Sequence, residues 1–360
     1  MTRPPTRGLA RAAASLLGCV ALAGCGDGAD VRASREAVAD AGAGPATPAP
    51  TSTPAPDTSP AETPDDGDTV LDTTPIARYL EPGAYERVTL DDGERPILEG
   101  SWLRPTVNDS WTWQLQGPLV TKYEVDWYVI DMFSTLGRDS IERLRAEGRN
   151  VLCYFSAGTY EPWRPDVHFF DEADLGPPHL GFPDEPWLDP ADEKIMRIMA
   201  NRMDMAVAIG CDGVELDNVD AFVQETGFDV TREEQVRFVK ILANEAHERN
   251  LTVALKNSVE LIAETKDWFD LAINEQCFER PLAVLDPSGV PTGETVPECV
   301  YYEPLTRDGK PVFGAEYRPE VIDDPVERER MCVQARRMNM RTLMLPHALD
   351  GSFRYSCDDG

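Results

Sequence analysis

The chain has 360 residues, a formal net charge of −30 at pH 7 and 42% hydrophobic residues. A chain of this length and apolar content can bury a sizeable core. The strong excess of acidic residues argues against nucleic acid as a partner and makes a cationic ligand a better candidate.

The first 24 residues read as an export signal. Three arginines precede an apolar run over residues 12–23, which is too short to span a bilayer, and the run closes with small residues before Cys25. This pattern resembles a bacterial lipoprotein signal, in which the cysteine becomes the lipidated first residue. An ordinary secretory signal is the alternative. We therefore expect an exported protein of the bacterial cell envelope, attached to the membrane through a lipid anchor on Cys25.

Residues 25–69 are rich in Pro, Ala and Thr and have almost no large apolar side chains. Such a segment cannot bury enough surface to offset the entropy of ordering it, so we predict a disordered linker that acts as an extended tether. Residues 70–110 form an N-terminal extension to which the sequence assigns no role. Residues 111–360 form the predicted catalytic domain.

Eight β-rich runs follow one another along this domain, and most precede a segment with apolar residues at three- and four-residue spacing. Asp189 and Thr231 stand where helix N-caps are expected. Eight strands that alternate with helices indicate an α/β fold, a closed (β/α)8 TIM barrel. An open doubly wound sheet would show the same alternation, but the glycine-rich phosphate turn typical of that fold is missing. The predicted strands span 111–117, 127–133, 151–158, 213–219, 252–258, 271–277, 311–317 and 342–348, and the predicted helices span 138–148, 191–210, 231–250 and 324–339.

Nearly every predicted strand ends in a polar or ionisable residue. Active sites of such barrels lie at the carboxyl ends of the strands, and buried charges without partners are costly, so these side chains are expected to meet at one cavity. Aromatic faces also suit the C–H faces of sugar rings, which adds a loop tryptophan to the set. The candidate ligand-binding residues are Asp131, Tyr154, Ser156, Trp163, Asp220, Lys256, Asn257 and Tyr317.

Two carboxylates, Asp217 and Glu275, stand out because each follows apolar strand residues and each comes from a different strand. Glycoside hydrolysis needs such a pair: one acid protonates the leaving oxygen, and the other carboxylate attacks the anomeric carbon or activates water. In a barrel we expect these two strands to face each other across the mouth. The alternative is a structural ion pair of either carboxylate with Lys256, which Glu215 could also contact.

The six cysteines of the domain predict disulfides, since export favours them. No C-x-x-C pair or Cys/His cluster occurs, so neither a metal site nor a cofactor is expected. Six cysteines allow fifteen pairings. Local closure favours Cys277 with Cys299 and Cys332 with Cys357.

The motifs YFSAGTYEPWRPD, EPWLD, GVELDNVDAF, VALKNS, NEQCF and VFGAEY together resemble glycoside hydrolase family 114, whose characterised members are endo-α-1,4-polygalactosaminidases. The resemblance implies a (β/α)8 enzyme that cleaves galactosamine-containing polysaccharide in an endo fashion with two catalytic carboxylates. We expect a monomer with an amino-sugar polysaccharide as its substrate. It carries the catalytic aspartate to Asp217 in DNVD and the catalytic glutamate to Glu275 in NEQC. The sequence departs from the family pattern by an insertion at residues 282–293, which borders the expected site.

We expect a retaining mechanism with Asp217 as nucleophile and Glu275 as acid/base, and inversion is the rival. Two further alternatives remain at this point. A surface lipoprotein could bind polysaccharide without cleaving it, since barrels host many functions. A metal-dependent hydrolase could use Asp131, Asp217 and Glu275 as oxygen ligands.

Overall fold

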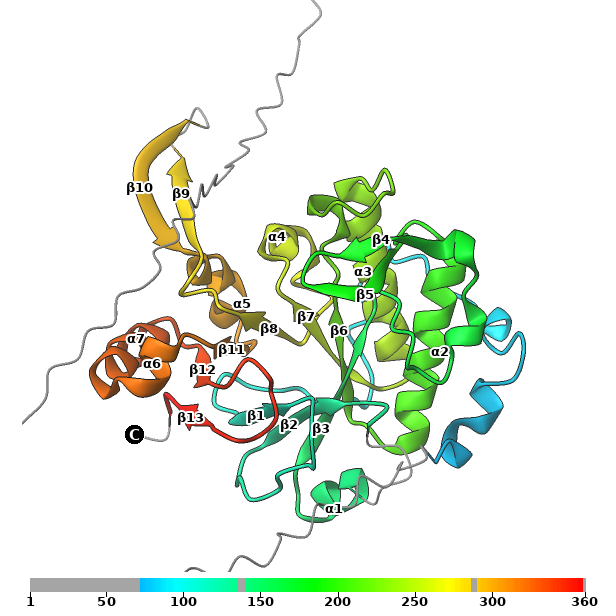
Figure 1. Ribbon diagram of the computed structural model, residues 1–360, viewed down its shortest axis with the longest axis horizontal. Coiled ribbons are helices and arrows are strands. Elements are labelled where there is room, and N and C mark those ends of the chain that lie inside the picture. The colour runs from blue at the N-terminus through cyan, green and yellow to red at the C-terminus, as the bar shows by residue number, and fades with distance from the viewer. Residues whose placement is uncertain (1–71, 135–139, 286–289, 359–360) are drawn as a thin grey trace, which may run out of the picture. The chain divides into compact units, whose positions relative to one another are not determined.

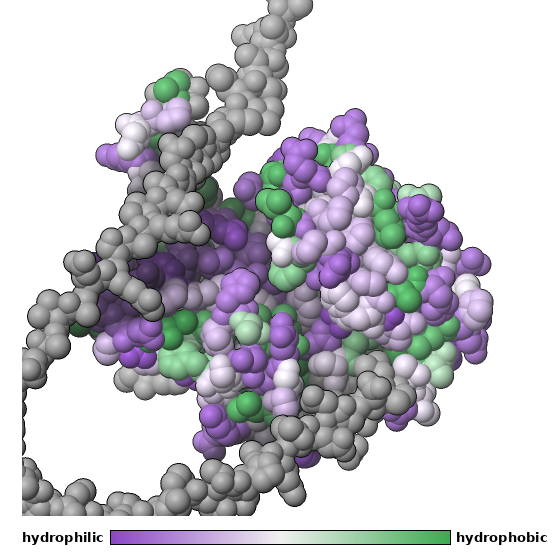
Figure 2. Space-filling model, in the orientation of Figure 1, coloured by the Kyte–Doolittle hydropathy of each residue, from purple (hydrophilic) through white to green (hydrophobic). Residues whose placement is uncertain are grey.

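The computed structural model describes residues 72–134, 140–285 and 290–358 (Figure 1). The predictions for the export signal, Cys25 and the linker lie outside these residues. Within the described ranges no helix combines the length and apolar character needed to cross a membrane. Hydrophilic residues are spread over the visible face, with apolar residues scattered between them (Figure 2), as expected for a strongly acidic chain.

The core of the fold is a nine-stranded sheet in which the first eight strands follow chain order and are parallel. Each of these eight strands lies in one of the eight predicted runs, or within one residue of it. The ninth strand, β13, pairs antiparallel with β12. The strands are β1 (Trp111–Gln114), β2 (Trp127–Asp131), β3 (Asn150–Ser156), β6 (Gly213–Asp217), β7 (Thr252–Lys256), β8 (Leu271–Glu275), β11 (Val312–Glu316), β12 (Arg341–Met344) and β13 (Tyr355–Ser356).

The sheet is curled and resembles a TIM barrel, but it differs from the expected closed barrel at its seam. Among the described strands, β1 does not pair with β12 or β13. The Arg354 guanidinium, just before β13, donates to the Trp111 carbonyl on β1. Two backbone amides after β1 donate to the carbonyl of Leu349. The first and last strands of the sheet are therefore joined by side-chain and loop hydrogen bonds. The segment between β12 and β13 makes these contacts in place of strand-to-strand pairing.

The two faces of the sheet pack in separate apolar clusters, as the alternation of side chains along a strand requires. Trp111 of β1 stacks on Phe313 of β11 with ring centroids 4.8 Å apart, although these strands are far apart in the sheet order. This contact lies across the concave face. Val214 and Leu216 of β6 pack on the other face, in the cluster that includes the helices.

The helices cover the outer face of the sheet, and all four predicted helical segments form (Figure 1). Thr231 caps its helix as expected and forms a capping box with Glu234. The expectation for Asp189 is wrong: the cap of the preceding helix is Asp192, while Asp189 accepts from the amide of Ala191 in the turn before it. The helices are α1 (Ser140–Ala146), α2 (Glu193–Ile209), α3 (Arg232–Glu248), α4 (Ile262–Thr265), α5 (Glu303–Arg307), α6 (Pro319–Asp323) and α7 (Pro325–Arg337).

Two antiparallel hairpins interrupt the βα alternation and border the carboxyl ends of the strands. The first consists of β4 (Leu175–His179) and β5 (Phe182–Leu188). The second, β9 (Pro281–Leu285) with β10 (Pro291–Pro297), is formed by the inserted segment and stands away from the sheet (Figure 1).

The segment before β1 packs along α2 and α3. Ile76 is fully buried, and the amide of Asn201 on α2 donates to the Tyr79 carbonyl. Trp102 stacks on His247 of α3 and donates its indole N–H to Asp270. Residues 72–110, which had no assigned role, thus cover the outer surface of these two helices.

Three disulfides are present in the described residues, a number typical of an extracytoplasmic protein. Cys277–Cys299 and Cys332–Cys357 are the two pairs that the sequence favoured. The third, Cys153–Cys211, was not anticipated. It joins two segments that are adjacent only because β3 pairs with β6.

Replacing Cys153 and Cys211 together by alanine is expected to lower the free energy of unfolding by about 4 kcal/mol, the loop-closure entropy of a crosslink spanning 58 residues. Chemical denaturation of the oxidised protein measures this loss. The same change at Cys332 and Cys357, which span 25 residues, is the control with a slightly smaller expected loss. Unchanged stability of the first variant would contradict the prediction.

Candidate active site

A cavity of about 950 Å³ opens at the carboxyl ends of the parallel strands. This volume is at the upper end of those typical for small-ligand sites. Asp217 and Glu275 both line it, and their side chains are 18% and 26% exposed. The two carboxylates that sequence reasoning selected therefore share one solvent-reached cavity.

Lys256 connects these carboxylates from below. Its ammonium nitrogen lies 3.1 Å from Asp217 Oδ1 and 3.3 Å from Glu275 Oε2. A third carboxylate, the buried Glu215, lies 3.0 Å away and accepts a hydrogen bond. The alternative of an ion pair with Lys256 is thus correct for both carboxylates, yet neither is sealed from the cavity.

The order of the strands explains this cluster. β7, which ends in Lys256, lies between β6 and β8 in the sheet. Glu215 and Asp217 are two residues apart on β6, so both point to the same face as Lys256. The expectation that the two catalytic strands face each other across the mouth is wrong, because a single strand separates them.

Each of these three strands ends in a sharp turn. Asn218, Asn257 and Gln276 follow the ionisable residues directly, and all have positive φ, at 59°, 45° and 62°. Asparagine tolerates this left-handed conformation better than most residues, and such strained turns gather at functional sites. The chain therefore leaves each strand immediately after its charged side chain, which opens the space above the carboxylates.

Hydrogen-bond donors surround both carboxylates. Asp217 accepts from the Tyr154 hydroxyl at 3.0 Å and from the Asn218 amide at 2.8 Å. Glu275 accepts from the Tyr317 hydroxyl at 2.6 Å. Burial first, and then the adjacent carboxylate, raises the pKa of each tyrosine well above its usual value, so both remain neutral donors.

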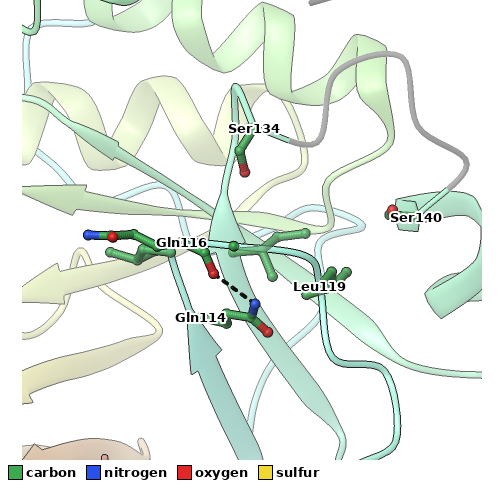
Figure 3. Close-up of a pocket in the computed structure, with 8 residues that line it drawn as sticks. Gln114, Gln116, Leu119, Ser134 and Ser140 are labelled. Atoms are coloured by element: carbon green, nitrogen blue, oxygen red, sulfur yellow. Dashed lines mark hydrogen bonds between the residues drawn. The ribbon is translucent and has the colours of Figure 1, made fainter. Parts of the chain in front are cut away.

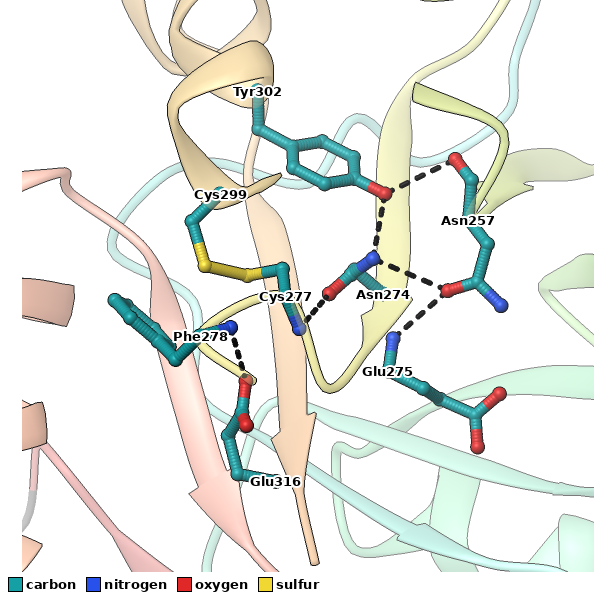
Figure 4. The surroundings of a disulfide bond; sticks show 8 residues. All are labelled: Asn257, Asn274, Glu275, Cys277, Phe278, Cys299, Tyr302 and Glu316. Carbon is teal, nitrogen blue, oxygen red and sulfur yellow. Dashed lines mark hydrogen bonds between the residues drawn. A yellow bond between two sulfur atoms is a disulfide. The ribbon is translucent and has the colours of Figure 1, made fainter. Parts of the chain in front are cut away.

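Polar side chains behind Glu275 fix its backbone (Figure 4). Asn257 Oδ1 accepts from the Glu275 amide at 2.9 Å and from the Asn274 side chain at 3.2 Å. Asn274 also donates to the hydroxyl of the buried Tyr302 and accepts from the amide of Cys277, which the disulfide holds. The position of Glu275 thus depends on a buried network and a covalent crosslink.

The surroundings raise the pKa of both Lys256 and Glu215, with opposite effects on their charge. Burial lowers the pKa of Lys256, but Asp217, Glu215 and Glu275 together raise it well above the usual value, so the ammonium stays charged. Burial raises the pKa of Glu215 to about 7, against the lowering effect of Lys256. The lysine therefore provides positive charge at the base of the cavity throughout the physiological range.

The eight candidate ligand-binding residues differ in their access to the cavity. Six of them line it: Asp131, Tyr154, Trp163, Asp220, Lys256 and Asn257. Ser156 does not, because its hydroxyl is fully buried and bonded to Thr159 and Asn218. Tyr317 is also buried, and reaches the site only through its hydrogen bond to Glu275. Asp131 lines the cavity but is engaged by Arg164 at 2.7 Å.

Sequence reasoning missed several residues that line the cavity. Glu161 pairs with Arg164, and Glu185 comes from the unpredicted β4–β5 hairpin. Arg280 and Glu298 stand at the base of the β9–β10 hairpin. Glu161, Arg164 and Glu185 lie in the motifs YEPWR and EPWLD, where charged residues stand close to aromatic ones. This pattern is the signal that could have pointed to them.

A second, much smaller cavity of about 20 Å³ lies beside the end of β1 (Figure 3). It has room for a single water molecule and no sugar ring. The Gln114 side chain lines it and is occupied by the backbone of Gln116, Pro118 and Val120. Gln114, the polar residue at the end of β1, therefore stabilises the turn that follows the strand.

One group of potential metal ligands occurs among the described residues, formed by Cys277, Cys299 and Glu316. The two sulfurs are bonded to each other, so neither is a thiolate available to a metal. The paired carboxylates of the large cavity already have an ammonium as their shared cation.

Two carboxylates that share a cavity at the carboxyl end of a TIM-barrel-like sheet, on strands with one strand between them, are the arrangement that glycoside hydrolases use. The family model for glycoside hydrolase family GH114 matches residues 94–360. The chain belongs to this family and is a glycoside hydrolase.

The similar solved structures agree with this assignment. Ega3 of Aspergillus fumigatus, in complex with galactosamine, is 32% identical, with a TM-score of 0.62 over 72% of this chain and 98% of that one. The glycoside hydrolase domain of PelA from Pseudomonas aeruginosa is 19% identical, with a TM-score of 0.50 over 68% and 96%, and supports the fold alone. No curated protein sequence matches the chain significantly.

Gly158 follows β3, and a Cβ there would lie 1.8 Å from the carbonyl oxygen of Asn218. Gly158→Ala is therefore expected to displace the Asn218 backbone and the adjacent Asp217, lowering turnover by about 100-fold, as small misplacements of reacting groups do. The rate of reducing-end release measures this effect. Gly309→Ala is the control, because a Cβ there meets no atom within 4 Å and the residue does not line the cavity. Equal rates of the two variants would refute this role of Gly158.

Proposed function

We propose that the chain is an exported, endo-acting glycoside hydrolase that cleaves α-1,4-linked galactosamine-containing polysaccharide. The observation that carries this proposal is the shared cavity of Asp217 and Glu275, bridged by one lysine. Membership of family 114 and the galactosamine bound by Ega3 support an amino-sugar substrate.

The charge of the cavity supports a cationic substrate. Its lining includes more acidic than basic side chains, and a partly deacetylated amino-sugar polymer carries ammonium groups near neutral pH. Asp220 on the rim and the 56% exposed Trp163 would bind hydroxyl groups and the apolar face of a sugar ring. Residues of the β4–β5 hairpin, together with Arg280 and Glu298 at the base of the second hairpin, extend the lining of the cavity beyond the two carboxylates, which suits cleavage within a chain.

In the proposed reaction Glu275 donates a proton to the glycosidic oxygen while the Asp217 carboxylate attacks the anomeric carbon and forms a glycosyl-enzyme ester. Glu275 then removes a proton from water, which attacks the same carbon and releases Asp217. The assignment follows the surroundings: Asp217 has two neutral donors and the closer contact to Lys256, which stabilises its negative charge, while Glu275 is more exposed.

The chain would act outside the cytoplasm as a monomer, attached to the envelope through lipid on Cys25. Three disulfides support export. The lipoprotein-like signal in the sequence is the basis for the anchor.

The purified protein is expected to shorten a de-N-acetylated α-1,4-galactosamine polymer to oligosaccharides of several lengths. Asp217→Asn keeps the size of the side chain but removes the nucleophile, so cleavage should fall by at least about 1,000-fold while the polymer still binds. Product length is scored by chromatography in excess chelator, which removes any metal-dependent activity. Undiminished cleavage by the variant would refute the proposed mechanism, and binding without cleavage by the wild type would indicate a polysaccharide-binding lipoprotein.

We expect the first products to retain the α-configuration. Asp217 Oδ1 and Glu275 Oε2 lie 3.1 and 3.3 Å from the same nitrogen, so these two oxygens are at most about 6.4 Å apart, a bound that includes the roughly 5–5.5 Å separation of the carboxyl groups in retaining enzymes. Proton NMR of the newly formed anomeric centre, recorded before mutarotation, tests this. Initial formation of β-anomers would favour inversion instead.

A further inference from the structure

Buried carboxylates in this protein have cationic partners, with few exceptions. Asp131 and Glu161 pair with Arg164, Asp166 with Arg202, and Glu215 with Lys256. Glu185 on β5 is only 8% exposed and lines the cavity, yet no lysine, arginine or histidine of the described residues lies within ion-pair distance of it. Such burial without a counter-ion is costly unless a ligand supplies the missing charge.

The hydrogen bonds around Glu185 form an ordered chain. Ser156 Oγ accepts from the Thr159 amide and the Asn218 side chain, so the Ser156 hydroxyl proton points to Thr159 Oγ1. Thr159 in turn donates its proton to Glu185 Oε2 at 3.0 Å. One neutral donor thus orients the carboxyl group and leaves acceptor capacity for a ligand.

The charges facing Glu185 also favour an incoming cation. Burial, with contributions from Glu161 and Asp217, raises the pKa of Glu185 to about 7, and Arg164 opposes this only partly. Arg164 is already bound to Glu161 and Asp131. A compact ammonium group in the cavity would therefore meet a carboxylate with no competing partner.

The position fits the chemistry of a 2-amino sugar. The amine of such a sugar is on the carbon next to the anomeric carbon, so it must lie close to the nucleophile during attack. Glu185 belongs to the hydrogen-bonded chain that includes Asn218, the residue directly after Asp217. We propose that Glu185 binds the substrate's 2-ammonium group and selects free amino sugars over N-acetylated ones. This inference rests on the proposed function.

The other unpaired buried carboxyls fit this role less well. Glu298 also lines the cavity, but the positive charge of Arg280 is the largest influence that lowers its pKa. The Arg164 that acts on Glu185 is, by contrast, already paired with two other carboxylates. Glu316 has a pKa raised to about 8 by burial and accepts from the Phe278 amide, but it does not line the cavity (Figure 4). Glu316 therefore provides a matched control for removal of a buried acid outside the cavity.

Glu185→Gln preserves the shape and the acceptor for Thr159 but removes the charge. We expect KM for a de-N-acetylated galactosamine oligosaccharide to rise at least about tenfold, the effect of losing a charged hydrogen bond, with kcat changed much less. KM for the N-acetylated oligosaccharide should not rise. Glu316→Gln should leave both KM values unchanged.

Thermal stability separates this role from a structural one. Because folding raises the pKa of Glu185 from its usual value of 4.5 to about 7, ionisation penalises the folded state as pH increases from 4.5 through 7. Glu185→Gln should therefore melt at a higher temperature than wild type at pH 8, and this gain should disappear towards pH 4.5. A lower melting temperature together with losses on both oligosaccharides would indicate a structural residue and overturn the inference.

The failure of this inference is distinct from failure of the proposed function. If wild-type protein cleaves the de-N-acetylated polymer and Glu185→Gln has the same KM, the function stands and the role of Glu185 is refuted. If wild type cleaves neither polymer, the proposed function falls. In that case the inference is tested by calorimetry, which measures the Kd of wild type and of Glu185→Gln for the galactosamine oligosaccharide. A higher Kd for the variant would support the role of Glu185, and an equal Kd would overturn it.

Discussion

The contact of one buried ammonium with three carboxylates determines the arrangement of the site. Without Lys256, Asp217 and Glu275 would repel each other across a narrow space, and Glu215 would be a buried acid with no counter-charge. The lysine lies over the face of Trp113 at 4.6 Å, so its own position is fixed by the packed interior. A lysine held against the apolar core thus neutralises part of the negative charge of the carboxylates at the cavity.

The surrounding chain holds this cluster in place by making the strand ends rigid. Residues with left-handed backbone follow Asp217, Lys256 and Glu275 directly, and buried hydrogen bonds secure the turns. Local strain of this kind persists only when neighbouring structure compensates for it. The Cys277–Cys299 disulfide and the buried Tyr302 provide that compensation after β8. The two cavity carboxylates and the lysine therefore stand on the ends of strands with little freedom to move.

Local patterns in the sequence predicted the parallel strands and the two cavity carboxylates, because strand alternation and polar strand ends are properties of short segments. Features that depend on contacts between distant segments were not predictable. Ser156 has the strand parity of Tyr154 but is covered by a turn through Thr159. Cys153 and Cys211 pair because β3 and β6 are neighbours. Residues 175–188 are rich in proline and glycine, which are depleted in strands, so the sequence did not predict the hairpin that carries Glu185.

The hairpin formed by the inserted segment leaves the sheet immediately after Glu275, and a disulfide joins the two ends of its base. The Cys277–Cys299 crosslink closes the base of the hairpin. The length and side chains of the hairpin can therefore diverge with little effect on the positions of Asp217 and Glu275. Changes in this appendage would therefore reshape the outer surface of the domain and leave the cavity with its paired carboxylates unaltered.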